Sequence, residues 1–190
     1  MNVYDFDGTI YDGDSSIDFF VFCCKKNWKS IWILPGFAIS VLRYKFRKCT
    51  KEEMKSSYFR FVRCFDQIDW VIDAFWLENS HKMKAFYKKS HREDDIIISA
   101  SPDFLLKPMV EKMHVQLLAS QVDPQTGQFL GKNCSGEEKV RRLHEASDES
   151  IEEFYSDSLS DAPLSRLAKR SFLVKKDNII PWPQEKGLYK

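Results

Sequence analysis

Two aspartates one residue apart, Asp5 and Asp7, follow a short apolar run near the N-terminus, in the stretch DFDGTIYDGDSS. Carboxylates this close repel each other, so the pair calls for a bound cation or for one group that stays partly protonated. Side chains two residues apart on an extended chain lean to the same side. One carboxylate can then act as a nucleophile while the other transfers a proton.

A second acidic pair, Asp157 and Asp161, follows the later stretch EEFY. If the two stretches are neighbouring parallel strands, all four carboxylates enter one cavity, where they cannot all stay ionised without a counter-charge. Mg²⁺ resolves this conflict, because it accepts one or two carboxylates together with water and a phosphate oxygen. We therefore expect a Mg²⁺ site formed by Asp5, Asp7, Asp157 and Asp161.

The acidic residues also suggest how a phosphate ester would be cleaved. A carboxylate can attack phosphorus and form an aspartyl-phosphate that water later hydrolyses, and we assign this role to Asp5. Asp7, kept partly protonated by its acidic neighbour, would protonate the leaving alcohol and later accept a proton from water.

Polar groups at other strand ends could hold the phosphoryl group. Ser99 ends the apolar run DDIII, and Lys139 lies in a helical segment. Their hydroxyl and ammonium groups would stabilise the charge on the phosphoryl oxygens. Backbone N–H groups at turns and helix starts favour anions, so we expect Gly8 and Ala100 to line the substrate site as well.

The pattern of apolar residues divides the chain into two kinds of structure. Residues 2–6 resemble a strand, residues 15–91 have helical periodicity, and from Asp94 onward strands alternate with helices. The alternation predicts an α/β fold, a Rossmann-like doubly wound parallel sheet. Its catalytic core would comprise residues 1–13 and 93–190, with residues 14–92 inserted after the first strand as a helical cap. Ligands bind beyond the carboxyl ends of such strands, so the cap would cover the site.

Local signals add four predictions. The stretch TKEE, Thr50–Glu53, matches a capping box at a helix start. A long helix is expected over about 69–89 and another over about 162–169. The turn residues in 122–131 predict a hairpin.

Composition excludes several function classes. The 29 basic and 28 acidic residues nearly balance, so no nucleic-acid partner is expected. Basic clusters at 43–55 and 82–92 are typical of solvated helix faces. The five cysteines form no CxxC pattern, which is typical of a reduced, cytoplasmic protein. The N-terminus does not resemble a signal peptide.

The segment SIWILPGFAISVL, Ser30–Leu42, is the most apolar stretch of the insert. It is shorter than the roughly 20 apolar residues that a membrane-crossing helix needs, and Pro35 and Gly36 interrupt it. We therefore expect no integral membrane segment and interpret this stretch as a buried bend between helices.

Four motifs, in order and spacing, resemble those of the haloacid dehalogenase superfamily: DFDGTI, the serine of IISAS, the lysine of GEEKVRRL, and YSDSLSDAP. The insert, with GDSS soon after the first motif, resembles the cap of the phosphoserine-phosphatase-like subgroup (subfamily IB). The resemblance implies that Asp5 is the nucleophile and Asp7 the acid/base. It also implies phosphoryl binding by Ser99 and Lys139, and Mg²⁺ binding at Asp157, with Asp161 as a further ligand or a neighbour of one.

The predicted function is hydrolysis of a small phosphorylated metabolite by a Mg²⁺-dependent phosphatase. Transfer to another acceptor, as in a phosphotransferase or mutase, stays open because the motifs do not select the acceptor. A non-catalytic binding module is disfavoured, since no motif residue is missing. A third alternative is a membrane-surface-associated phosphatase acting on an amphipathic phosphate ester, since the insert is aromatic and basic. The sequence does not predict the oligomeric state.

Overall fold

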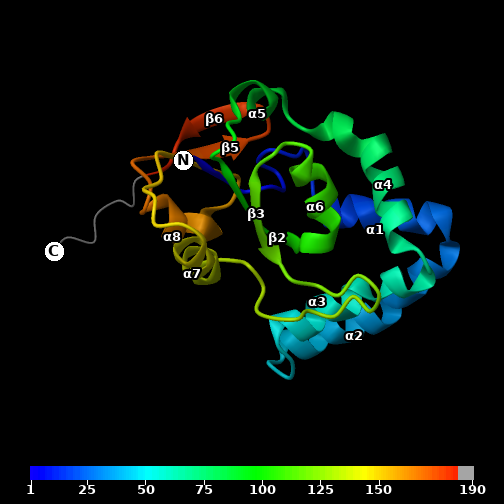
Figure 1. Cartoon of the computed structure of the whole chain (residues 1–190). Helices are drawn as coiled ribbons and strands as arrows, with labels where there is room; N and C mark the ends of the chain where they lie inside the picture. The colour runs from blue at the N-terminus through cyan, green and yellow to red at the C-terminus, as the bar shows by residue number, and fades with distance from the viewer. Residues whose placement is uncertain (184–190) are drawn as a thin grey trace.

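A computed structural model describes residues 1–183 of the 190-residue chain (Figure 1). Its centre is a six-stranded sheet with the order β3-β2-β1-β4-β5-β6. All neighbouring strands are parallel except the last pair, β5 and β6. The strands are β1 Val3–Tyr4, β2 Ile96–Pro102, β3 Gln116–Ser120, β4 Glu153–Ser156, β5 Arg170–Lys175 and β6 Asn178–Pro181.

The first strand lies at the middle of the sheet. Val3 pairs with Ile96 on one side and with Phe154 on the other. The consecutive residues 96–98 are all buried, as expected for a parallel strand that is covered on both faces. From β1 the sheet extends through β2 and β3 on one side and through β4, β5 and β6 on the other. The carboxyl ends of β1, β2 and β4 therefore meet at the point where the strand order reverses.

Helices cover both faces of the sheet, which confirms the predicted α/β fold (Figure 1). On one face, α6 Asp103–Glu111 joins the insert in a large aromatic core that includes Phe19, Phe75 and Trp76. On the other face, a smaller core contains Leu143 and Leu164. Those two residues come from α7 Glu137–Ala146 and α8 Ala162–Ser165.

A helical insertion follows β1, as predicted. Its elements are α1 Ser15–Lys26, η1 Trp28–Ile33, α2 Leu34–Lys45, α3 Lys51–Phe59, η2 Arg60–Cys64, α4 Ile68–Asn79, η3 Ser80–Lys82 and α5 Ala85–Ser90. The capping box is confirmed: Thr50 Oγ1 accepts from the backbone N–H of Glu53, and the Glu53 carboxylate accepts from that of Thr50. The domain boundaries at 13/14 and 92/93 stay a prediction.

The expected long helix over 69–89 is wrong. The chain forms α4, a short η3 turn and α5, with extended backbone at Met83 and Lys84 between them. Met83 pairs with Tyr11, and the backbone N–H of Lys84 donates to the carbonyl of Ile10 at 2.8 Å. Pairing with the loop after β1 thus outweighs the local helical preference.

The expected buried bend at Ser30–Leu42 is also wrong. Pro35 lies in the first turn of α2, where its missing N–H costs no helical hydrogen bond, so the helix starts there instead of bending. None of the residues of α2 is buried. Within residues 1–183, no helix is long and apolar enough to cross a membrane.

Two later segments differ in extent from their predictions. The hairpin over 122–131 is a tight turn closed by one antiparallel bridge between Val122 and Phe129. The helix expected over 162–169 ends at Ser165. The N–H of Lys169 already donates to the carbonyl of Ile151 at 3.0 Å, so the chain must straighten there to enter β5.

Candidate active site

A cavity of about 680 Å³ lies at the carboxyl ends of β1, β2 and β4, under the insert. All eight site residues that the sequence predicts line it, although they come from distant parts of the chain. They are Asp5, Asp7, Gly8, Ser99, Ala100, Lys139, Asp157 and Asp161. The four predicted carboxylates therefore do enter one cavity.

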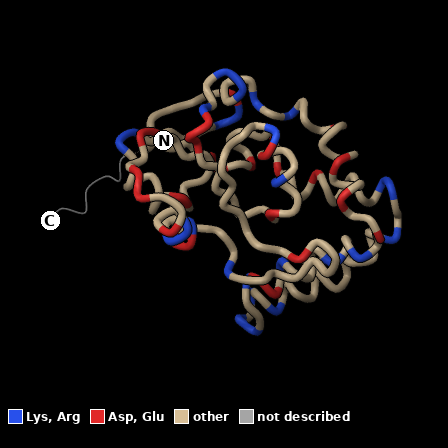
Figure 2. Tube along the Cα trace, viewed as in Figure 1, with Lys and Arg blue, Asp and Glu red and all other residues tan. Residues whose placement is uncertain are grey.

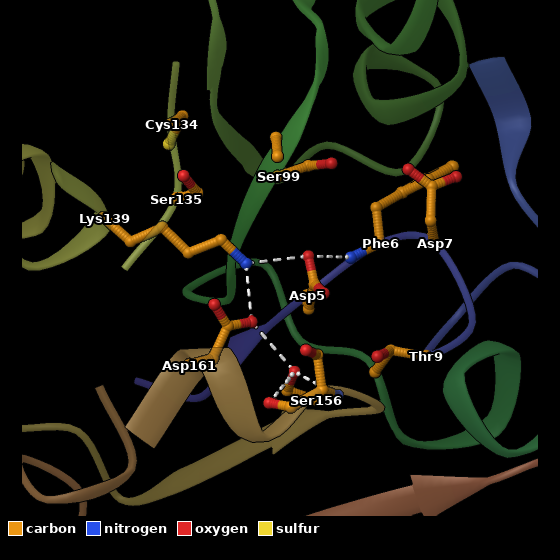
Figure 3. A network of polar contacts seen from close by, with 12 residues as sticks. Asp5, Phe6, Asp7, Thr9, Ser99, Cys134, Ser135, Lys139, Ser156 and Asp161 are labelled. Atoms are coloured by element: carbon orange, nitrogen blue, oxygen red, sulfur yellow. Dashed lines mark hydrogen bonds and ion pairs between the residues drawn. The ribbon is translucent and has the colours of Figure 1, made fainter. Parts of the chain in front are cut away.

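Lys139 bridges two carboxylates at the floor of this cavity (Figure 3). Its Nζ lies 2.9 Å from Asp5 Oδ1 and 2.7 Å from Asp161 Oδ2. All three residues are buried. Burial alone would lower the pKa of Lys139, but the charges of Asp5 and Asp161 outweigh it and the pKa is raised, so the ammonium stays charged. Burial raises the pKa of Asp5 despite the attraction of Lys139.

Backbone contacts hold Asp5 at the end of β1. Its N–H donates to the carbonyl of Tyr155 in β4 at 2.9 Å, which fixes its backbone beside β4 while its side chain lines the cavity. Asp5 Oδ1 also accepts from the N–H of Phe6 at 2.9 Å (Figure 3). The same oxygen accepts from Lys139. No hydrogen bond within residues 1–183 engages Asp5 Oδ2, so this oxygen is available to a ligand in the cavity.

Asp7 turns toward the insert and the end of β2. Its Oδ1 accepts from the N–H of Ser15 at 2.6 Å, and its Oδ2 accepts from the hydroxyl of Ser101 at 2.5 Å. Removal from water raises the pKa of Asp7 to about 6, while the hydrogen bonds from Ser101 and Ser15 oppose this rise. A carboxyl with this pKa can be protonated or ionised near neutral pH, as an acid/base requires.

Gly8 allows the loops after β1 and β4 to approach each other. It has a φ of +70°, and a Cβ there would lie 2.1 Å from Asp157 Oδ2. The N–H of Asp157 donates to Thr9 Oγ1 at 2.8 Å, which ties the loops after the two strands together. Only glycine therefore leaves room for the Asp157 carboxylate beside this turn.

Ser99 and Ala100 lie in the middle of β2, where its side chains enter the cavity. Ser99 Oγ accepts from the N–H of Ser101 at 3.1 Å, and the carbonyl of Ala100 accepts from the Lys55 ammonium at 2.8 Å. Burial, followed by the charge of Lys51, lowers the pKa of Lys55 to about 8. The insert thus places a cation next to the predicted phosphoryl-binding segment.

Among the polar residues that sequence reasoning missed are Lys55 and Ser101, which line the cavity, and Lys84, which contacts the loop after β1. Lys84 was interpreted as part of a solvated basic face, but it is buried. Its Nζ donates to the carbonyl of Gly8 at 2.6 Å and to that of Lys176 at 2.8 Å, so it braces the loop after β1. A signal existed only for Ser101, which is two residues from Ser99 and therefore leans to the same side of an extended chain.

A sequence model of the haloacid dehalogenase-like hydrolase family matches residues 3–166. The chain belongs to this family. The match spans all four motifs that line the cavity, from the first aspartate pair to Asp161. No curated protein sequence matches the chain significantly.

Solved structures of haloacid dehalogenase-like and related proteins share the fold. A protein of unknown function from Bordetella pertussis has a TM-score of 0.66 at 17% identity, covering 90% of this chain and 87% of that one. A phosphoserine phosphohydrolase-like protein from Francisella tularensis has a TM-score of 0.55 at 12% identity, with coverages of 93% and 90%. A probable phosphoserine phosphatase from Vibrio cholerae has a TM-score of 0.56 at 14% identity, with coverages of 90% and 55%. These similarities establish a shared fold.

The donor set of the cavity fits a hard cation that needs few protein ligands. Within residues 1–183, no three His, Cys, Asp or Glu side chains are grouped closely enough to hold a metal by themselves. Asp161 is bound to Lys139 and Ser156, while Asp7 is bound to Ser15 and Ser101. Asp5 and Asp157 remain, and two carboxylates completed by water and phosphate suit Mg²⁺.

Proposed function

We propose that the protein is a Mg²⁺-dependent phosphatase that hydrolyses a phosphomonoester through an aspartyl-phosphate intermediate. The observation that carries this proposal is the position of Lys139, charged and buried between Asp5 and Asp161 at the cavity floor. A buried cation there compensates the negative charge of the Asp5 carboxylate before substrate binds, and it can bind phosphoryl oxygens afterwards.

In the first half of the reaction, Asp5 Oδ2 attacks phosphorus and the bond from phosphorus to the ester oxygen breaks. Asp7 donates its proton to the departing oxygen, so the alcohol leaves in neutral form. In the second half, Asp7 accepts a proton from water, and this water attacks the phosphorus of the aspartyl-phosphate. Inorganic phosphate is released and Asp5 is regenerated.

Ser99 and Lys139 bind the phosphoryl oxygens in both halves. Asp5 and Asp157 would hold Mg²⁺, with Asp161 acting through Lys139 as a positioning residue. When bound, the ion neutralises the carboxylates and the transferring phosphoryl group, which lowers the repulsion between two anions. Burial raises the pKa of Asp157, and a cation is the partner that would keep it ionised.

The walls of the cavity favour an ester with an apolar part. The insert contributes five apolar side chains to the lining, Ile17, Phe37, Met54, Tyr58 and Phe59, together with the polar Asp14, Ser16 and Lys55. The phosphoryl end is held at the floor, so only the leaving group reaches these side chains. We therefore place substrate selection in the insert and favour an amphipathic phosphomonoester over a fully polar one.

The test is hydrolysis by the purified protein of a small aryl phosphate and of monoalkyl phosphates of increasing chain length. We expect turnover that requires Mg²⁺ and stops on chelation. We also expect kcat/KM to rise by about tenfold for every two methylene groups that reach the apolar wall. Absence of turnover with Mg²⁺, Mn²⁺ or Co²⁺ would reject the proposed phosphatase activity. A kcat/KM that does not change with chain length would reject only the preference for an apolar leaving group.

Gly8→Ala should raise the Mg²⁺ concentration that gives half-maximal activity. The new methyl group would displace the Asp157 carboxylate, which lies 2.1 Å from its position. We expect a loss of about tenfold or more in metal affinity, measured by titration of activity, and Asp157→Ala should have a similar effect. The two changes should be much less than additive in the double variant, because both act on one carboxylate.

Gly36→Ala is the matched control, since a Cβ there meets no atom within 4 Å. It should leave the Mg²⁺ titration unchanged. A thermal melt of each variant separates the backbone strain at Gly8 from the effect on metal binding. Full additivity of Gly8→Ala and Asp157→Ala would show that Asp157 is not the group displaced.

A further inference from the structure

The insert exposes a group of large apolar side chains that we call the outer face: Trp28, Ile31, Trp32, Ile39, Leu42 and Phe46. They belong to η1, α2 and the turn that follows. Trp28, Trp32 and Phe46 are 65%, 67% and 69% exposed. Single exposed apolar residues are common, but a contiguous group marks an interaction site.

The apolar side of α2 faces away from the rest of the protein. Ile39, Leu42 and Phe46 recur at intervals of three and four residues, which places them on one side of the helix. On the opposite side, the Phe37 ring lies 5.1 Å from the ring of Tyr58 in α3 and lines the cavity. A helix at a water-exposed surface normally has the reverse arrangement, with its polar side outward.

The charge along the chain segment that carries the outer face has one sign, although Glu52 and Glu53 of the neighbouring α3 lie beside Arg43. From Phe19 to Lys51 the chain contains eight basic residues and no acidic one: Lys25, Lys26, Lys29, Arg43, Lys45, Arg47, Lys48 and Lys51. Within residues 1–183, Lys26 alone among them forms an ion pair, at 3.5 Å from the exposed Glu78. Figure 2 shows Lys and Arg residues gathered near the two ends of the η1–α2 segment.

We propose that the outer face docks on an anionic lipid membrane surface. Tryptophan side chains favour the boundary between headgroups and acyl chains, and lysine and arginine side chains are attracted to anionic headgroups. An apolar helix side flanked by two clusters of cations supplies both interactions, so α2 would lie in the interface parallel to the membrane. This location agrees with the lack of any membrane-crossing helix within residues 1–183.

A second copy of the chain fits this surface less well. A two-fold interface would bring the same patch of each copy together, so the unpaired cations of both copies would face each other. Lipid headgroups supply the missing negative charge instead. The proposal concerns binding alone and does not depend on the phosphatase reaction.

The test is co-sedimentation of the full-length protein with phosphatidylcholine vesicles, with and without phosphatidylglycerol. We expect binding to the anionic vesicles that weakens as salt is added. Tryptophan fluorescence should shift to shorter wavelength on binding, because Trp28 and Trp32 leave water. The Trp28→Ser/Trp32→Ser variant should bind at least about tenfold more weakly and lose most of the shift, and Lys45→Glu/Lys48→Glu should bind about tenfold more weakly.

Trp70→Ser is the matched control. Trp70 is 73% exposed but lies on α4 between Asp69 and Asp73, where an anionic surface would be repelled. This variant should bind vesicles like the parent protein. Thermal melts of all variants show whether each is folded.

Three results would overturn the proposal. The first is no binding to anionic vesicles, and the second is equal loss of binding in Trp70→Ser and in the outer-face variants. The third is a dimer in sedimentation velocity that Trp28→Ser/Trp32→Ser dissociates, without vesicle binding by the parent protein. That result would assign the outer face to a second copy of the chain.

Discussion

Asp5→Asn is expected to abolish both turnover and the covalent phosphoenzyme, with a loss of kcat of about a thousandfold or more. The amide that replaces the carboxylate is a much weaker nucleophile, and the proposed attacking oxygen, Asp5 Oδ2, is lost. Activity on an aryl phosphate and intact-protein mass after substrate addition both report on this variant. The substitution is nearly isosteric, so the fold should persist.

Asp7→Asn is the matched comparison, because it removes a carboxylate from the same loop without removing the proposed nucleophile. It should still bind phosphate but turn over slowly, since the leaving alcohol receives no proton. A gain of one phosphoryl group in mass on Asp5→Asn would overturn the assignment of the nucleophile. If Asp7→Asn lost the phosphoenzyme and Asp5→Asn kept it, Asp7 would be the nucleophile and Asp5 the acid/base.

Lys139→Met should destabilise the protein by about 3–5 kcal/mol in addition to removing activity. The ammonium is buried between Asp5 and Asp161, and its loss leaves two carboxylates close together without a counter-charge. Denaturant unfolding of the protein in chelator measures this cost. Lys107→Met is the control, because the Lys107 side chain is 67% exposed and lies 3.8 Å from Glu111, so its loss should cost less than about 1 kcal/mol.

The cost of Lys139→Met should depend on pH and on Asp161. Burial already raises the pKa of Asp5, and loss of the ammonium raises it further. A carboxyl whose pKa is higher in the folded state stabilises the fold most at low pH, and this contribution is lost as the pH rises through the folded pKa. The deficit relative to the parent should therefore be smaller at pH 5 than at pH 8.

Lys139→Met/Asp161→Asn should be more stable than Lys139→Met, because one of the two uncompensated charges is gone. If the changes in unfolding free energy caused by Lys139→Met and Asp161→Asn simply add in the double variant, the two side chains are not coupled. A Lys139→Met protein as stable as the parent would show that the buried network contributes nothing to the fold.

The sequence predicted the sheet, and it selected eight residues that line one cavity, because both have local signatures. Apolar runs such as 96–98 mark buried parallel strands, and the polar residues that follow them reach the cavity because strand ends in a parallel sheet meet at one edge. The prediction failed where one segment had to fit another. The helix over 69–89 breaks because Met83 and Lys84 pair with the loop after β1.

By itself, the sequence determined which residue types end each strand, and hence which chemistry the cavity can perform. Only the tertiary structure decided how those residues pair. It bound Asp161 to Lys139, left Asp157 beside Gly8, and turned the apolar side of α2 outward. Lys139 and Asp5 are 134 residues apart, so neither carries a local signal of the other. Their contact depends on strand order, which only the packing of both sheet faces establishes.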